Sequence, residues 1–341
     1  MKRVAPGFLL PSAAFSVKRK QVRFYQFLDK PPEVGDVIYG KVSRIGQHSE
    51  IENKLDRIHR INDGSKSVFV FGNRYAPDYY EAMIPESMEA TVDLVARSGV
   101  IGVVSTKNSS VKDPTRIRVL GYVCDEDGQI LNTRNYRLIA PTLTEKKPNR
   151  AKLILVVGTA MNAGKSMSAV ACCWALSAMG YAVRASKITG TASLKDILHM
   201  QDAGAEIVND FSHVGFPSTY LLDESDVLKI FNDIDLKYGN NAKNFWVVEL
   251  ADGIMQRETA MLLRSPDVRS RIHRLVFAAH DAFSAVGGIN TLKSEFDLDP
   301  DAISGVCSSS PLAIRELSQF TNIPVFNNMQ RDLQQLSEIL L

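Results

Sequence analysis

Two kinds of hydrophobic pattern divide the chain. Before about residue 140, apolar residues alternate with polar ones in short runs, and this period of two is typical of half-buried β-strands. After about residue 152, short runs that are apolar throughout are followed by stretches with helical spacing, as in a parallel sheet covered by helices. We therefore expect a smaller β-rich domain over residues 1 to 145 and an α/β domain over residues 152 to 341.

The first half contains four segments with the alternation of a strand. Between them, the polar stretch from Ser43 to Asp63 has four apolar residues near helical spacing, which predicts one helix; they are Ile51, Leu55, Ile58 and Ile61. The Asp-Gly pair at the end of Asp125 to Gly128 predicts a tight hairpin turn. The pattern thus predicts an α+β domain that is β-rich and barrel-like. Its strand segments are Gly35 to Val42, Ser67 to Phe71, Gly99 to Val104 and Arg116 to Val123.

The second half repeats a unit of apolar run, glycine turn and helical segment. Short apolar strands that alternate with helices predict a doubly wound, mostly parallel sheet with helices on both faces. Prolines, threonines and charges from Ala140 to Lys152 predict a linker before this domain. The strand segments are Leu153 to Val157, Ala182 to Ser186, Phe245 to Leu250, Arg274 to Ala279, Ala302 to Cys307 and Pro324 to Phe326.

The composition is that of an ordinary folded soluble protein, with 45% hydrophobic and 23% charged residues. A formal net charge of +2 creates no overall field that would select nucleic acid or an acidic membrane surface. No uninterrupted apolar stretch reaches the length of about 18 residues that a membrane span needs. We therefore expect neither partner. The four cysteines lack the spacing of a zinc site and fit a reducing cytoplasm.

The stretch from Leu153 to Gly180 predicts a phosphate-binding loop, because a buried strand, a glycine turn, Gly-Lys-Ser and a helix follow in order. Glycines let successive N–H groups point at phosphate oxygens, and the helix directs its positive end at the same anion. Lys165 is expected to reach the β- and γ-phosphates, and Ser166 to ligate Mg²⁺. The residues expected to contact the nucleotide are Gly158, Thr159, Asn162, Ala163, Gly164, Lys165, Ser166 and Met167.

Five residues separate Gly158 from Gly164, one more than in the common form of this loop. The spacing resembles that of dethiobiotin synthetase, the cobyrinic acid amidating synthases and the deviant P-loop ATPases allied to them. Ser186 to Gly190 resembles the lysine-bearing turn of dethiobiotin synthetase. Val247 to Gly253 is similar to the Val-Glu-Gly segment of that family, and its Asp-Gly end is a turn signature. The resemblance spans nearly all of residues 152 to 341.

The resemblance implies roles for several charged residues. Lys187 would be a second cation beside the transferred phosphoryl group, and Glu249 would contribute to the Mg²⁺ site. Asp196 and Asp202 both follow Lys187 at distances that suit a second acidic ligand, and the sequence does not separate them. The implied nucleotide is ATP. GTP is not excluded, because the asparagine that reads the base in the family is missing from Ser304 to Ser310.

The leading hypothesis is a Mg²⁺- and ATP-dependent synthetase or ligase, related to dethiobiotin synthetase but not identical with it. It would transfer the γ-phosphoryl group to a carboxylate or carbamate of a small metabolite, with Lys165 and Lys187 as the catalytic residues. One alternative is a nucleotide-driven switch or chaperone that hydrolyses ATP or GTP and acts on a protein partner. Another is a kinase of a small metabolite. The resemblance also implies a homo-oligomer, in particular a dimer.

Overall fold

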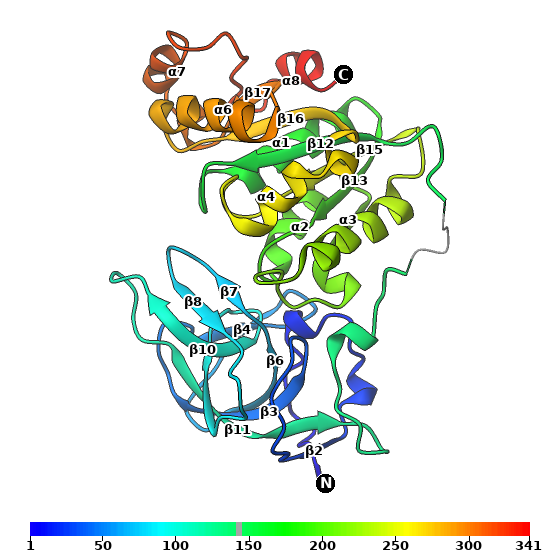
Figure 1. The fold of residues 1–341 in the computed structure, drawn as a ribbon, viewed down its shortest axis with the longest axis vertical. Helices are drawn as coiled ribbons and strands as arrows, with labels where there is room; N and C mark the ends of the chain where they lie inside the picture. The colour runs from blue at the N-terminus through cyan, green and yellow to red at the C-terminus, as the bar shows by residue number, and fades with distance from the viewer. Residues whose placement is uncertain (141–144) are drawn as a thin grey trace. The chain divides into compact units, whose positions relative to one another are not determined.

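The structure is a computed structural model that describes residues 1 to 140 and 145 to 341, so residues 141 to 144 of the expected linker lie outside the described residues. The chain forms two compact units (Figure 1). The first contains residues 1 to 140 together with residues 190 to 195 and 210 to 221, and the second contains the other residues. The first unit therefore includes two short segments from the second half of the chain.

Five strands of the first unit pair in a closed ring. β3 (Val37–Arg44) pairs with β6 (Lys66–Phe71), and β6 pairs in parallel with β10 (Val100–Lys107). β10 pairs with β9 (Thr91–Leu94), β9 with β11 (Thr115–Cys124), and β11 returns to β3, all antiparallel. This ring confirms the expected barrel and all four predicted strand segments. The chain also turns after β11, where Asp125 N–H donates to the carbonyl of Gln129.

Further strands pair with β11 and β10 outside the ring, and the unit also contains short 3₁₀ helices. β1 and β2 continue the sheet beyond β11, whereas β8 and β7 continue it beyond β10. The sequence pattern did not predict these strands, because two to four residues are too few to show a period. Their bounds are β1 (Lys2–Arg3), β2 (Phe24–Gln26), β7 (Arg74–Tyr75) and β8 (Tyr80–Met83), and the 3₁₀ helices are η1 (Ser12–Ala14), η2 (Arg19–Gln21), η3 (Thr133–Asn135) and η4 (Phe211–Val214).

The helix predicted within Ser43 to Asp63 is wrong, since the segment forms an antiparallel hairpin. Ile51 and Ile61 point into the barrel core, but Leu55 is 81% exposed, so the apolar residues do not form one buried helical face. Asn53 stabilises the turn, because its carboxamide oxygen accepts hydrogen bonds from two later backbone N–H groups. The strands of the hairpin are β4 (Glu50–Glu52) and β5 (Ile58–Arg60).

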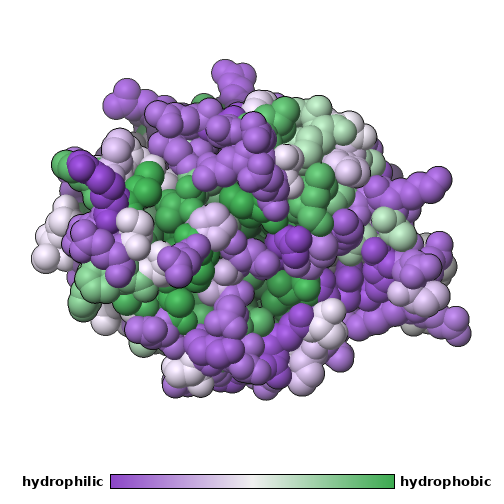
Figure 2. All heavy atoms as spheres, turned by 90° about the horizontal axis from the view of Figure 1, so that it is seen from above, coloured by the Kyte–Doolittle hydropathy of each residue, from purple (hydrophilic) through white to green (hydrophobic). Residues whose placement is uncertain are grey.

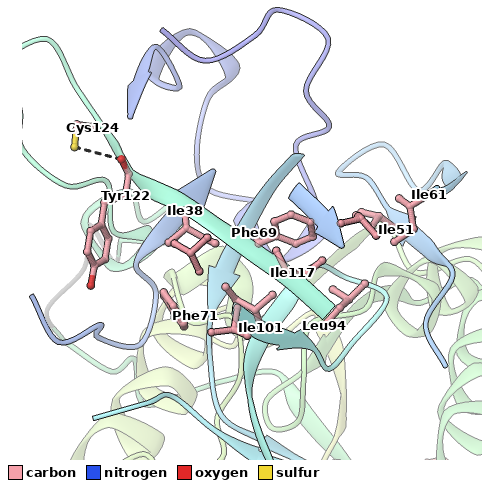
Figure 3. Packing of buried hydrophobic residues seen from close by; sticks show 13 residues of the cluster. Ile38, Ile51, Ile61, Phe69, Phe71, Leu94, Ile101, Ile117, Tyr122 and Cys124 are labelled. Carbon is pink, nitrogen blue, oxygen red and sulfur yellow. Dashed lines mark hydrogen bonds between the residues drawn. The ribbon is translucent and has the colours of Figure 1, made fainter. Parts of the chain in front are cut away.

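Buried apolar residues of the barrel strands, mostly at alternate positions, fill the barrel interior (Figure 3). Along β3 the inward positions are Ile38, Gly40 and Val42. A Cβ on Gly40 would lie 2.6 Å from Cγ2 of Ile117 and 3.1 Å from a ring carbon of Phe69, so glycine leaves the room that these larger residues occupy. The other buried residues of this core are Ile51, Ile61, Phe71, Val92, Leu94, Ile101, Val119, Tyr122 and Cys124.

The second unit is built on a six-stranded sheet in the order β14-β13-β15-β12-β16-β17. β12 lies between β15 and β16 in parallel with both, and the pairs β13–β15 and β16–β17 are parallel as well. This topology confirms the predicted doubly wound, mostly parallel sheet. The strands are β12 (Lys152–Gly158), β13 (Ala182–Lys187), β14 (Ile207–Asp210), β15 (Asn244–Glu249), β16 (Ile272–Ala278) and β17 (Ala302–Ser304).

Helices connect these strands and cover the sheet. The chain moves one way along the sheet from β12 to β13 and the other way from β15 to β16, so right-handed crossovers place α1 and α4 on opposite faces. The helices are α1 (Lys165–Ala178), α2 (Leu194–Asp202), α3 (Glu224–Tyr238), α4 (Arg257–Arg264), α5 (Pro266–Arg269), α6 (Ala282–Phe296), α7 (Pro311–Leu317) and α8 (Leu333–Leu340), with the 3₁₀ helix η5 (Val306–Ser309) after β17.

The last two predicted strands differ from the structure. The segment Ala302 to Cys307 is a strand only as far as Ser304, because Gly305 has a φ of 98° and turns the chain into η5. The segment Pro324 to Phe326 is not a strand and makes one isolated bridge, from Val325 to Ile303. The length of an apolar run does not show how many of its residues pair with a neighbouring strand.

The surface is mainly hydrophilic, with apolar residues scattered among polar ones on the face that Figure 2 shows. Exposed large apolar side chains of the second unit include Phe283, Leu312 and Phe320. Single exposed apolar residues are normal in folded proteins. Among the described residues, each helix falls short of the length and apolar character that crossing a membrane requires.

Gly40→Ala is expected to destabilise the barrel by about 1–3 kcal/mol, because the added methyl group overpacks the core beside Ile117 and Phe69. Urea unfolding of the full chain measures the change. Gly7→Ala is the matched control, since a Cβ there meets no atom within 4 Å. Equal stability of the two variants would contradict this account of the core.

Candidate functional site

The loop between β12 and α1 has a backbone that turns tightly in front of the helix. Asn162 has a φ of 61° and Gly164 a φ of 98°, both in the left-handed region. A Cβ on Gly158 would lie 2.7 Å from the carbonyl oxygen of Ala278 and 2.9 Å from Cγ of Lys165, so glycine is required there. The loop ends at the N-terminus of α1, where backbone N–H groups without helical partners and the helix dipole favour an anion.

The corner after β17 supports this loop from the side. The N–H of Val306 donates to the carbonyl of Ala163 over 3.1 Å. A Cβ on Gly305 would lie 2.3 Å from that carbonyl oxygen, and a Cβ on Gly164 would lie 2.7 Å from Cα of Gly305. Two glycines from distant parts of the chain thus allow the backbones to touch. Nothing near Gly305 in the sequence marks this contact, so the sequence pattern does not predict it.

Lys165 begins α1 and is only 6% exposed. Its Nζ donates to the carbonyl oxygen of Ala160 over 2.6 Å, so this hydrogen bond joins the buried ammonium to a neutral acceptor. Burial lowers the pKa of Lys165, and the carboxylates of Glu249 and Asp252 oppose that effect. A buried cation of this kind is stabilised by an anion placed against it.

Lys187 ends β13 directly opposite Glu249, which ends the neighbouring strand β15. The ammonium of Lys187 donates to the carboxylate of Asp196, and its Nζ lies 3.8 Å from Oε1 of Glu249. Burial acts to lower the pKa of Lys187, but Asp196 and Glu249 together outweigh it, and the pKa is raised. Lys187 is therefore held as a charged ammonium at the carboxyl edge of the sheet, where α/β proteins bind ligands.

Glu249 links Lys187 to the loop between β12 and α1. It is 2% exposed, and its Oε1 accepts a hydrogen bond of 3.0 Å from the hydroxyl of Ser166. Its Oε2 is buried and has no hydrogen-bond partner among the described residues. Burial raises the pKa of Glu249, and the charge of Lys187 opposes this.

A hydroxyl beside a carboxylate with an unused oxygen fits the hard oxygen ligands that Mg²⁺ prefers. Within residues 1 to 140 and 145 to 341, no group of three or more His, Cys, Asp or Glu side chains is placed to hold a metal ion. Mg²⁺ usually keeps several waters and takes few protein ligands, so Ser166 and Glu249 would be the residues to hold it if it binds here.

The sequence did not show whether Asp196 or Asp202 lies near Lys187, and the structure distinguishes between them. Asp196 lies in the first turn of α2 and binds Lys187. Asp202 is the last residue of the same helix, is exposed, and lies roughly 9 Å further along the helix axis. Asp196 is thus the aspartate that shares the cluster with Lys187 and Glu249.

The remaining loop residues surround the turn. Asn162 is exposed and Met167 is half-buried in the first turn of α1. The hydroxyl of Thr159 is buried and lacks a hydrogen-bond partner among the described residues. A second turn covers the start of the loop, because Ile254 N–H donates to the carbonyl of Gly158 over 2.9 Å and a Cβ on Gly253 would lie 2.3 Å from the carbonyl oxygen of Thr159.

No protein-family model matches the chain, and no curated protein matches it either. Similar solved structures include the signal recognition particle receptor FtsY from Elizabethkingia anophelis in complex with GDP, with 11% identity over 61% of this chain and 69% of that chain and a TM-score of 0.37. Another is a ParA family ATPase from Chlorobium tepidum TLS, with 14% identity over 56% of this chain and 91% of that chain and a TM-score of 0.35. Likenesses at these TM-scores carry no conclusion about function.

Lys187→Met is expected to lower the free energy of unfolding by about 3 kcal/mol, because Asp196 and Glu249 would remain close together without their cation. Urea unfolding at neutral pH measures this loss. Lys195→Met removes an exposed lysine nearby and is expected to change stability by less than about 0.5 kcal/mol. Equal values for the two variants would show that the buried cluster is not held by Lys187.

Proposed function

We propose that the chain binds a Mg²⁺–nucleoside triphosphate at the loop from Gly158 to Ser166 and transfers its γ-phosphoryl group. The observation that carries this proposal is the buried ammonium of Lys165 at the N-terminus of α1, hydrogen-bonded to a neutral carbonyl. The loop glycines and the helix terminus add further groups that favour an anion at the same place. A triphosphate supplies the negative charge that this arrangement stabilises.

The other residues of the cluster support phosphoryl transfer rather than simple anion binding. Lys187 adds a second positive charge, and Asp196 fixes the orientation of its ammonium. Ser166 and Glu249 would hold Mg²⁺, which when bound neutralises charge on the phosphate oxygens. Lys165 and Lys187 would donate hydrogen bonds to the oxygens of the transferred group and stabilise the charge that develops on them.

The acceptor that we propose is a carboxylate or carbamate of a small metabolite, with ATP as the donor. The resemblance of Ser186 to Gly190 and Val247 to Gly253 to segments of dethiobiotin synthetase supports a synthetase or ligase reaction. In such a reaction the phosphorylated carboxyl group would be attacked by an amine or a similar nucleophile, and phosphate would leave.

A nucleotide-driven switch that acts on a protein partner is the second candidate. The observation that favours it is the division of the chain, because residues 190 to 195 belong to the first unit although Lys187 and Asp196 on either side belong to the second. A site flanked in this way is suited to transmit its state to another part of the protein.

Lys165→Ala is expected to weaken the binding of Mg²⁺–ATP or Mg²⁺–GTP by about 30-fold, because a charged hydrogen bond to phosphate is worth about 2 kcal/mol. Calorimetry on the full chain measures the affinity. Lys195→Ala is the control, because Lys195 is exposed, and it is expected to bind as the wild type does. Failure of the wild-type protein to bind either nucleotide would reject the proposed function.

The synthetase and switch candidates make opposite predictions for turnover. Phosphate release from Mg²⁺–ATP is expected to rise when a fraction of small carboxylated metabolites is added. Stimulation by a protein fraction alone would favour the switch instead, and a stable phosphorylated metabolite would indicate a kinase. Lys165→Ala should lack all stimulated release, which identifies any contaminating ATPase.

A further inference from the structure

The segment from Gly190 to Lys195 is firmly held within the first unit. Gly190 and Thr219 exchange hydrogen bonds, from the N–H of Thr219 to the carbonyl of Gly190 and from the N–H of Gly190 to the hydroxyl of Thr219, each 2.9 Å long. Ala192 N–H donates to the carbonyl of Pro217 over 3.0 Å. The segment therefore has a defined conformation before α2 begins.

Glu52 of the β4–β5 hairpin caps helix α2. Its Oε1 accepts a hydrogen bond of 3.0 Å from the N–H of Leu194, the first residue of the helix. Arg97 holds Glu52 in place, since the carbonyl of Arg97 accepts from the N–H of Glu52 over 2.8 Å and its Nη2 lies 4.0 Å from Oε2. Glu52 is 1% exposed. A carboxylate at this position satisfies an unpaired helix N–H and interacts favourably with the helix dipole.

The turn that Glu52 caps also carries Asp196. Asp196 lies two residues after Leu194, about 3 Å along the axis of the same helix. Its carboxylate binds Lys187, which in turn lies beside Glu249. Because a helical turn is stiff, a change in the position of Leu194 is passed on to Asp196 and so to the cation at the phosphate site.

We propose that Glu52 is a positioning residue for the phosphate site: by capping α2 it fixes Asp196 and Lys187, and so couples the β4–β5 hairpin to nucleotide binding. The nucleotide part of this inference rests on the proposed function, whereas the capping part does not. Coupling is reciprocal, so a nucleotide that orders Lys187 and Asp196 also stabilises the contact between Glu52 and Leu194.

The test compares Glu52→Ala and Glu52→Gln with Asp36→Ala in the full chain. Asp36 is a matched control because it is a buried carboxylate of the first unit that accepts from the N–H of Glu33 and from Asn132, and it has no hydrogen bond to α2 among the described residues. Two readouts are needed: hydrogen exchange of the amides at 194 to 197 without nucleotide, and the affinity for Mg²⁺–ATP.

Glu52→Ala is expected to speed exchange at 194 to 197 by roughly 10-fold and to weaken Mg²⁺–ATP binding by roughly 5-fold or more. Glu52→Gln keeps an oxygen acceptor, so it is expected to retain most of the wild-type protection from exchange at 194 to 197 and most of the wild-type affinity for Mg²⁺–ATP. Asp36→Ala is expected to lower overall stability while leaving exchange at 194 to 197 and nucleotide affinity close to those of the wild type.

Equal effects of Glu52→Ala and Asp36→Ala on exchange at 194 to 197 would overturn the positioning role, as would unchanged affinity in Glu52→Ala. If Glu52→Ala does not fold, Glu52→Gln is the test. Loss of the charge alone should still change the exchange at 194 to 197 and the affinity for Mg²⁺–ATP, by less than is expected of Glu52→Ala, and no change in either readout would overturn the proposal. Wild-type protein that binds no nucleotide would reject the proposed function and the coupling to it, while the exchange readout would still judge the capping of α2.

Discussion

The buried ion cluster around Lys187 is the interaction on which the candidate site depends. Lys187, Asp196 and Glu249 come from a strand, a helix and a second strand, and loss of Lys187 would leave the buried carboxylate of Glu249 close to that of Asp196 without their shared cation. The cluster therefore fixes the carboxyl ends of β13 and β15 relative to the first turn of α2. Ser166 joins the same carboxylate and adds the phosphate loop to this arrangement.

Close backbone contacts determine the shape of the loop itself. Gly158, Gly164 and Gly305 lie where a Cβ would meet backbone or side-chain atoms at less than 3 Å. The loop is thus shaped by segments that pack around it. Under the proposed function, a loop shaped in this way would present its N–H groups to phosphate without rearranging, and such preorganisation stabilises charge efficiently.

The first unit does more than enclose its own core. Its barrel is closed by pairings between β9 and both β10 and β11, and the segment that forms the β4–β5 hairpin adds Ile51 and Ile61 to the barrel core. Through Glu52 this hairpin meets the start of α2, and the segment from Gly190 to Lys195 packs with the same unit. These contacts are the basis of the positioning role proposed for Glu52.

The sequence by itself determined the strands with a clear period, the doubly wound sheet and the loop from Gly158 to Ser166, because these depend on spacing within a few residues. The helix predicted between Ser43 and Asp63 was wrong, because four apolar residues matched a helical period by chance, whereas Ile51 and Ile61 of the observed hairpin segment pack into the barrel core. Only the tertiary structure placed Asp196 rather than Asp202 beside Lys187 and brought Gly305 against the loop. The physical reason is that these contacts join segments far apart in the chain, and local spacing carries no record of which segments meet.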